Sequence, residues 1–283
     1  MRRFLMMLMM LTGATAWAGG GQVTLPVDDR EAVRFAVIGD NGNGQPAQYD
    51  VGRQMVVAHG AFPFEFVVMV GDNLYGSQTR RDFVDKFEIP YGPLLRMKIP
   101  FFAALGNHDE PTNREYPGFN MGGQRYYSFV RGKARFFVFD TNFMDPKQLA
   151  WIESTLQAST DDWKIAVFHH PIYSDGDRHG SNIQMRVALE PLLTKYGVDV
   201  VLTGHEHIYE RIKPQKGITH FIVGSSGQLR KGGLTPSAMT AAGFDQDQAF
   251  MVATIIGEEM SFQVLSRTGV IVDSGVIRRR EKS

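Results

Sequence analysis

The sequence contains no cysteine among its 283 residues. A chain without cysteine cannot form disulfide bonds, bind zinc through thiolates or use a thiol as a nucleophile. Any metal site or catalytic group must therefore be built from histidine, carboxylate, amide or phenol side chains. Long apolar segments are also missing, because no run after the first 21 residues reaches the ~20 apolar residues of a membrane-spanning helix.

The chain has no excess charge of either sign, because 30 lysine and arginine residues balance 30 aspartate and glutamate residues. A neutral chain lacks the broad basic face of a stable nucleic-acid binder or a polybasic membrane patch. Hydrophobic residues make up 43% of the sequence, enough for the core of one large domain or two small ones. We therefore expect no stable nucleic-acid partner and, after processing, no membrane partner. We also expect a monomer that acts on a small molecule.

The first 21 residues read MRRFLMMLMMLTGATAWAGGG. A basic start, an apolar run from Phe4 to Leu11 and small residues around Trp17 are typical of a secretory signal peptide cleaved after Ala18. The alternative is a short membrane anchor, but the run is shorter than the ~20 residues that span a bilayer. We predict a signal peptide over residues 1–18 and a periplasmic or secreted mature protein.

The rest of the chain repeats one pattern, in which an apolar run ends in a short polar turn. Runs this apolar are typical of strands buried on both faces of the central sheet of an α/β protein. Helical patterns lie between them, at about residues 47–59, 146–156 and 183–196. Ligands of α/β proteins collect beyond the carboxyl ends of the strands, so we expect the polar turns to share one site. The runs with their turns are VRFAVIGD, FVVMVGD, PFFAALGN, ARFFVFD, WKIAVFHH and VDVVLTGH.

Toward the C-terminus the pattern changes to three closely spaced apolar runs, FMVATIIG, MSFQVLSRTG and VIVDSGVI. Their spacing predicts antiparallel strands with a turn at Thr268 and Gly269. These strands would form a sheet edge or a second sheet of the same unit. We therefore predict one domain over residues 31–280.

The polar turns offer a donor set suited to metal binding. Imidazole and carboxylate together suit iron, zinc or manganese better than calcium or magnesium. Seven ligands are too many for one tetrahedral ion, but two ions roughly 3.5–4 Å apart that share a carboxylate could use them for phosphate-ester hydrolysis. Taken singly, each aspartate is more simply explained as a helix cap and the tyrosine as a packed loop residue. The seven residues are Asp40, Asp72, Tyr75, Asn107, His169, His205 and His207.

The ordered motifs GDNG, GDNLY, GNHD, HHP and GHEH resemble those of the calcineurin-like metallophosphoesterases. Within that superfamily the chain is similar to the purple acid phosphatases of the small, tartrate-resistant type. Gly42 stands where most of the superfamily has a histidine, and Tyr75 supplies the tyrosine of this subgroup. The resemblance covers about residues 33–280. It implies an α/β fold, a four-layer α/β/β/α sandwich of two mixed sheets.

The resemblance also implies a binuclear metal centre with one ferric ion and one divalent ion, which is iron, zinc or manganese. In GHEH, alternate side chains share one face, so two histidines can reach neighbouring ions while Glu206 points away. By motif position, the ferric ion would be held by Asp40, Tyr75 and His207, the divalent ion by Asn107, His169 and His205, and both ions by Asp72.

Further histidines acquire roles from the resemblance. His108 in GNHD would contact the phosphate, and His179 in SDGDRHGSN would lie near the leaving group. His169 is taken as the ligand because the ligand of the family is followed by one residue and then proline. The alternative assigns the metal to His170 instead.

These residues predict an exported acid phosphatase that hydrolyses phosphate monoesters by attack of a metal-bound hydroxide. His108 and His179 would stabilise the phosphoryl group or protonate the leaving oxygen. A phosphodiesterase, or a phosphatase of pyrophosphate or polyphosphate, would use the same core. A protein that binds phosphate or metal without turnover is a third alternative. The loop 110–124, rich in Gly, Pro and Asn, is expected to form one wall of the substrate pocket.

Overall fold

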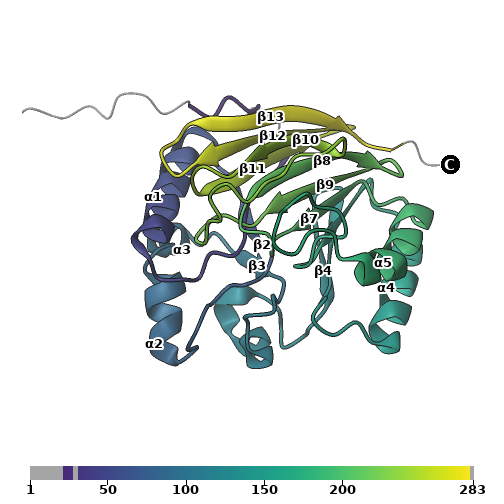
Figure 1. Cartoon of the computed structure of the whole chain (residues 1–283), viewed down its shortest axis with the longest axis horizontal. Helices are drawn as coiled ribbons and strands as arrows, with labels where there is room; N and C mark the ends of the chain where they lie inside the picture. The colour runs from purple at the N-terminus through teal and green to yellow at the C-terminus, as the bar shows by residue number, and fades with distance from the viewer. Residues whose placement is uncertain (1–21, 28–30, 281–283) are drawn as a thin grey trace, which may run out of the picture.

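The computed structural model describes residues 22–27 and 31–280 as two sheets that lie face to face with helices outside them (Figure 1). The predicted signal peptide, residues 1–18, lies outside the described residues. Within the described ranges, no helix is both long and apolar enough to cross a membrane.

Six strands form the first sheet, in the order β13 (Ile271–Arg278), β12 (Glu259–Ser266), β11 (Ala249–Ile256), β1 (Val33–Ile38), β2 (Phe66–Met69) and β3 (Phe101–Ala103). β1, β2 and β3 run parallel, whereas β11 pairs antiparallel with β1. β12 and β13 continue this antiparallel arrangement. The C-terminal strands predicted from the sequence are therefore confirmed, and they extend the sheet that begins with the first strand of the chain.

Seven strands form the second sheet, in the order β10 (Thr240–Phe244), β8 (Tyr209–Gln215), β9 (Ile218–Val223), β7 (Val200–Thr203), β6 (Trp163–Val167), β5 (Ala134–Val138) and β4 (Tyr127–Arg131). β5, β6, β7 and β9 run parallel. β4, β8 and β10 pair antiparallel with their neighbours. Both sheets are mixed, as predicted.

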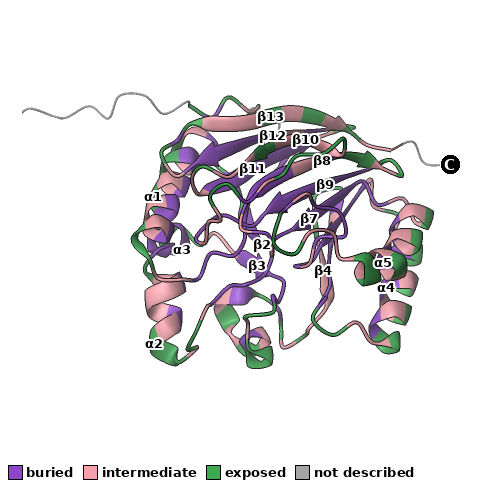
Figure 2. Ribbon diagram, in the orientation of Figure 1, coloured by how far each residue is buried: buried purple, intermediate pink, exposed green. Residues whose placement is uncertain are grey.

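Helices cover the outer face of each sheet (Figures 1 and 2). The first sheet carries α1 (Pro46–Ala61), α2 (Arg80–Phe83) and α3 (Gly92–Arg96), and the second carries α4 (Pro146–Ala158) and α5 (Ile183–Lys195). Short helical turns are η1 (Val84–Glu88), η2 (Pro111–Glu115) and η3 (Pro117–Phe119). The order helix, sheet, sheet, helix is the predicted four-layer sandwich, and α1, α4 and α5 coincide with the three predicted helical segments.

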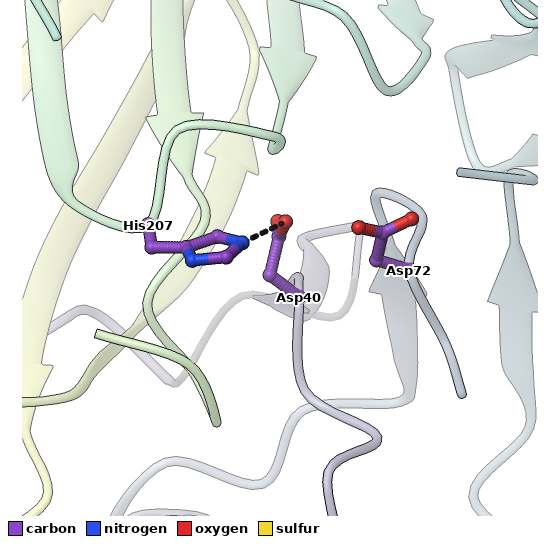
Figure 3. Close-up of side chains that lie close together, drawn as sticks. All are labelled: Asp40, Asp72 and His207. Carbon is purple, nitrogen blue, oxygen red and sulfur yellow. Dashed lines mark ion pairs between the residues drawn. The ribbon is translucent and has the colours of Figure 1, made fainter. Parts of the chain in front are cut away.

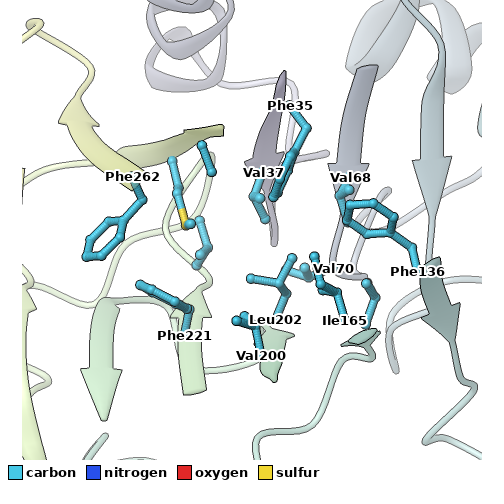
Figure 4. Packing of buried hydrophobic residues seen from close by; sticks show 14 of the residues in the cluster. Phe35, Val37, Val68, Val70, Phe136, Ile165, Val200, Leu202, Phe221 and Phe262 are labelled. Atoms are coloured by element: carbon cyan, nitrogen blue, oxygen red, sulfur yellow. The ribbon is translucent and has the colours of Figure 1, made fainter. Parts of the chain in front are cut away.

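The alternation of side chains along the strands separates the layers. In β1, Phe35 and Val37 pack into the core between the sheets (Figure 4). Ala36 and Ile38 pack with the helices of the first sheet. Both faces of such a strand are buried, which explains the continuous apolar runs in the sequence. Each fully buried large apolar side chain contributes about 1.5–3 kcal/mol to folding, so the central core holds the two sheets in a fixed relative position.

The polar turns follow strands that are parallel within their sheet, so they meet at one edge of the sandwich. Asp40 and Asp72 follow β1 and β2 of the first sheet, and His169 and His205 follow β6 and β7 of the second. Because the two sheets pack face to face, these turns come together, as the sequence pattern predicts.

Candidate metal centre and active site

All seven predicted ligands lie in one continuous cluster at the carboxyl edge of the two sheets. The first sheet supplies the carboxylates, the phenol and the amide, and the second sheet supplies the imidazoles. The cluster divides into two groups of atoms that meet at Asp72, one around the phenol of Tyr75 and one around the imidazole of His169.

The first group converges on the hydroxyl of Tyr75. Its Oη lies 3.2 Å from Asp40 Oδ1, 2.9 Å from Asp72 Oδ2 and 3.1 Å from His207 Nε2. Ligand atoms of Asp40, Asp72 and His207 all lie within 4.8 Å of one another (Figure 3). A phenol has a single proton, so two carboxylates and an imidazole compete for it. This arrangement matches the first coordination shell of a cation better than an ordinary hydrogen-bond network.

The second group converges on His169. Its Nδ1 lies 3.0 Å from the carbonyl oxygen of Val70, and a carbonyl can only accept, so this nitrogen carries a proton. In the neutral ring, Nε2 then presents a lone pair. It faces Asn107 Oδ1 at 3.1 Å, His205 Nδ1 at 3.2 Å and Asp72 Oδ1 at 3.4 Å. Asn107 Oδ1 and Asp72 Oδ1 can only accept, so the Nε2 lone pair of a neutral His169 faces two acceptor oxygens. A proton or a metal ion between these atoms stabilises such a buried arrangement.

The electrostatics of the cluster indicate the same requirement. Burial lowers the pKa of His169, but the charges of Asp72 and Asp40 outweigh it and raise the pKa to about 9. Burial raises the pKa of Asp40. Burial and the neighbouring His169 lower the pKa of His205 to about 2. The site therefore attracts positive charge, and its donor set of carboxylates, phenol, amide and imidazoles fits a binuclear metal centre.

The backbone at three of these residues is held in the left-handed region. Asp40, Asp72 and His205 have φ angles of 51°, 52° and 70°. For residues other than glycine this conformation costs on the order of 1–3 kcal/mol, less for aspartate, and it persists where surrounding contacts hold it. Here the His205 N–H donates to Asp40 Oδ2 at 2.9 Å, and the His108 N–H donates to Asp72 Oδ1 at 2.9 Å. These bonds aim the carboxylates into the cluster.

His108 and His179 lie beside different groups of the cluster: His108 is next to Tyr75, and His179 is next to His205. Both are exposed. The His108 ring centroid lies 4.7 Å from that of Tyr75, and the His179 ring centroid lies 4.2 Å from that of His205. A substrate bound at the cluster would therefore be within reach of both imidazoles.

His170 lies outside the cluster. Its Nδ1 is 2.8 Å from Thr141 Oγ1, and its ring centroid is 4.4 Å from that of His205. Burial and the neighbouring His169 lower the pKa of His170 to about 4. The geometry thus favours His169 over His170 as a ligand.

Asp109 is a further functional candidate, for which the sequence predicted no role. Its carboxylate accepts hydrogen bonds from the N–H groups of Gly106 at 2.8 Å, Asn73 at 3.1 Å and Leu74 at 3.0 Å. It also accepts one from Asn73 Nδ2 at 2.7 Å. Asp109 thereby joins the turn that carries Asn107 to the turn that carries Asp72. The signal in the sequence was its place in the motif GNHD.

Glu206 is a second such residue. Its side chain points away from the cluster, as expected from GHEH, and it is fully buried. Its Oε1 accepts hydrogen bonds from the N–H groups of His179 and Gly180, both at 2.6 Å. A Cβ atom at Gly176 would lie 2.5 Å from Glu206 Cδ, so a glycine allows this close approach. Glu206 therefore positions the loop that carries His179.

A cavity of about 510 Å³ lies beside the cluster. Asn107 and His170 line it next to the metal centre, and Arg125, Asp140 and Phe143 line it farther along the chain. The described loop 110–124 contributes one residue, Pro111, to the lining of this cavity. The segment 140–143 contributes more of the lining than the loop that we expected to form a wall, because the turn after β5 faces the turn after β3.

Comparison with known proteins identifies the class. The sequence profile of the calcineurin-like phosphoesterase family matches residues 33–209, and the chain belongs to this family. A solved structure titled GAP50, the anchor in the inner membrane complex of Plasmodium, superposes with a TM-score of 0.77 at 20% identity. That superposition covers 89% of this chain and 90% of the other, and it shows the shared fold.

Curated relatives identify the subgroup. Human tartrate-resistant acid phosphatase type 5 is 25% identical over 247 residues, which cover 69% of this chain and 73% of that protein. Purple acid phosphatase 3 of Arabidopsis thaliana is 30% identical over 240 residues, which cover 71% and 65%. The chain is a metal-dependent phosphoesterase of the purple acid phosphatase type. The predictions of family, fold class and enzyme class are confirmed.

The position of Glu206 generates a prediction. Glu206→Ala should leave the metal content unchanged and lower kcat about tenfold, because the loop of His179 loses two hydrogen bonds to a buried carboxylate. His179→Ala should cause little additional loss when combined with it, since both changes act on the same group. Steady-state kinetics of the four proteins in this cycle measure the coupling.

Glu153→Ala is the matched control, because Glu153 pairs with Lys195 at the surface. Additive losses in the double variant would show that Glu206 does not act through His179.

Proposed function

We propose that the protein is an exported acid phosphatase that hydrolyses phosphate monoesters with one ferric and one divalent ion. The observation that carries this proposal is the convergence of the seven ligand side chains from two sheets onto one cluster, in which Asp40, Asp72 and His169 are buried. Phenolate and carboxylate are hard anionic ligands that favour a trivalent ion, whereas an amide and imidazoles suit a divalent one. We assign the ferric ion to Asp40, Tyr75 and His207, the divalent ion to Asn107, His169 and His205, and both to Asp72.

A pair of metal ions supplies an activated water and neutralises charge on the phosphoryl oxygens. The residues of the chain orient the ester at this pair. His108, beside Tyr75, is placed to hold a phosphoryl oxygen, and His179, beside His205, is placed to give a proton to the leaving oxygen. The proposal of export rests on the signal peptide predicted over residues 1–18, and the oxidising space outside the cytoplasm suits a ferric ion.

A phosphodiesterase is the second candidate, because the same two-metal cluster acts on diesters. The acid phosphatase names of the curated relatives favour the monoester. The direct test measures kcat/KM of the purified, metal-loaded protein for p-nitrophenyl phosphate and for its bis ester between about pH 5 and 8. We expect clear preference for the monoester. A preference for the bis ester would replace the proposed activity, and no turnover of either would favour a binding protein.

Asp72→Asn tests the bridging role. Loss of one charge shared by both groups of the cluster should weaken both metal sites, so total metal and turnover should fall together. Elemental analysis and kcat measure the two effects. His108→Ala is the contrast: it should keep both metals while kcat falls ~10²–10⁴-fold. Two metals and normal turnover in Asp72→Asn would contradict the assignment.

Tyr75→Phe tests the ferric assignment. A phenolate bound to ferric iron absorbs visible light, and the substitution keeps the ring while removing the donor oxygen. We expect the visible band to vanish and part of the activity to survive, because a phenol ligand neither attacks phosphorus nor protonates the leaving group. The visible spectrum and iron content are the measurements. A colourless, iron-free wild type that is fully active with zinc or manganese would overturn the ferric site.

A further inference from the structure

The cavity beside the metal centre is large enough for more than a phosphate group. Its volume of about 510 Å³ falls in the range of pockets that hold whole organic ligands, ~300–1,000 Å³. Asn107 belongs both to the metal cluster and to the cavity lining. An ester whose phosphoryl group lies at the cluster would therefore extend its leaving group into this cavity. This step rests on the proposed function.

The charges that line the cavity do not suit an anionic leaving group. Among the described residues of the lining, Arg125 is the one lysine or arginine, and its guanidinium is already paired. Nη1 donates to Asp140 Oδ2 and Nη2 donates to Asp145 Oδ2, both at 2.8 Å. Asp140 is buried, and Asp109 adds another carboxylate to the lining. Asp140 and Asp145 thus neutralise the Arg125 guanidinium. Among the described residues of the lining, no unpaired lysine or arginine is left to bind a second phosphate group.

The remaining lining includes apolar surface. Leu105, Pro111 and Phe143 contribute to it. The Phe143 side chain is 64% exposed, and the guanidinium carbon of Arg125 lies 5.2 Å from its ring centroid. The cation–π contact restrains the ring, and the exposed ring offers area for packing against an apolar or aromatic group.

We infer that this cavity is the leaving-group site and that it selects uncharged, partly apolar leaving groups over anionic ones. Asp140 and Asp145 set this preference by neutralising Arg125, and Phe143 supplies the packing surface. Pyrophosphate and polyphosphate, whose leaving groups are anions, are poor substrates on this basis.

The test compares phenyl phosphate with 4-carboxyphenyl phosphate, which differ by one negative charge on the leaving group. Asp145→Asn removes one carboxylate from Arg125, and asparagine still caps α4 in place of the Asp145 Oδ1 that accepts from the Gln148 N–H. We expect kcat/KM for the carboxyphenyl ester to rise about three- to fivefold relative to that for phenyl phosphate, as for one partly exposed charge pair. A gain of this kind cannot arise from misfolding.

Asp85→Asn is the matched control, because it removes the partner of Arg81 away from the cavity lining. Phe143→Ala should lower kcat/KM for phenyl phosphate about fivefold, mainly through KM, with a smaller effect on glycerol phosphate. An unchanged ratio of the two aryl esters in Asp145→Asn, or a wild-type preference for the carboxyphenyl ester, would overturn the inference.

Failure of the proposed function has a different signature. The wild-type protein would then turn over neither ester. In that case the dissociation constants of both esters are measured instead of kcat/KM. The measurement uses the metal-loaded wild-type protein and the metal-loaded Asp145→Asn variant. A wild-type preference for phenyl phosphate that narrows in the variant supports the cavity assignment, and equal affinities reject it.

Discussion

The structure depends on holding two buried carboxylates close together with too few protons for the acceptors around them. Asp40 and Asp72 share the single hydroxyl proton of Tyr75, and Asp72 also lies 3.4 Å from Nε2 of the buried His169. Without a cation such an arrangement is unfavourable, because burial removes the water that would screen it. Metal ions bound between these groups would replace the unfavourable contacts with coordination bonds. The fold must therefore hold the ligands in place independently of their attraction for one another.

The two-sheet core provides that restraint. Each sheet carries part of the cluster, and the large side chains between them, such as Phe35, Phe136 and Phe221, fix the distance between the two edges. Backbone N–H groups then aim the carboxylates, as the His205 N–H does for Asp40. The left-handed backbone at Asp40, Asp72 and His205 is local strain that this rigid support sustains. The stability that comes from packing of the core thus offsets the cost of the strained backbone at the site.

The metal centre and the substrate surface are built from different parts of the same turns. In GHEH, two histidines face the cluster while Glu206 faces the opposite way and holds the loop of His179. In GNHD, Asn107 faces His169 while Asp109 joins two turns. Beyond β5, the ion-pair network of Arg125 forms a wall of the cavity. Each of these short motifs therefore supplies a metal ligand and also a residue that positions a neighbouring loop or turn.

The sequence by itself determined the chemistry of the protein and the position of that chemistry at strand ends. Apolar runs that stop at Asp40, Asp72 and His169 predict buried parallel strands, because only such strands lack a polar face. Tertiary structure alone decided the pairing of β11 with β1, which joins segments more than two hundred residues apart. It also decided which polar groups meet Glu206 and Arg125. Local sequence patterns report the neighbours along the chain, whereas these contacts depend on how the two sheets pack.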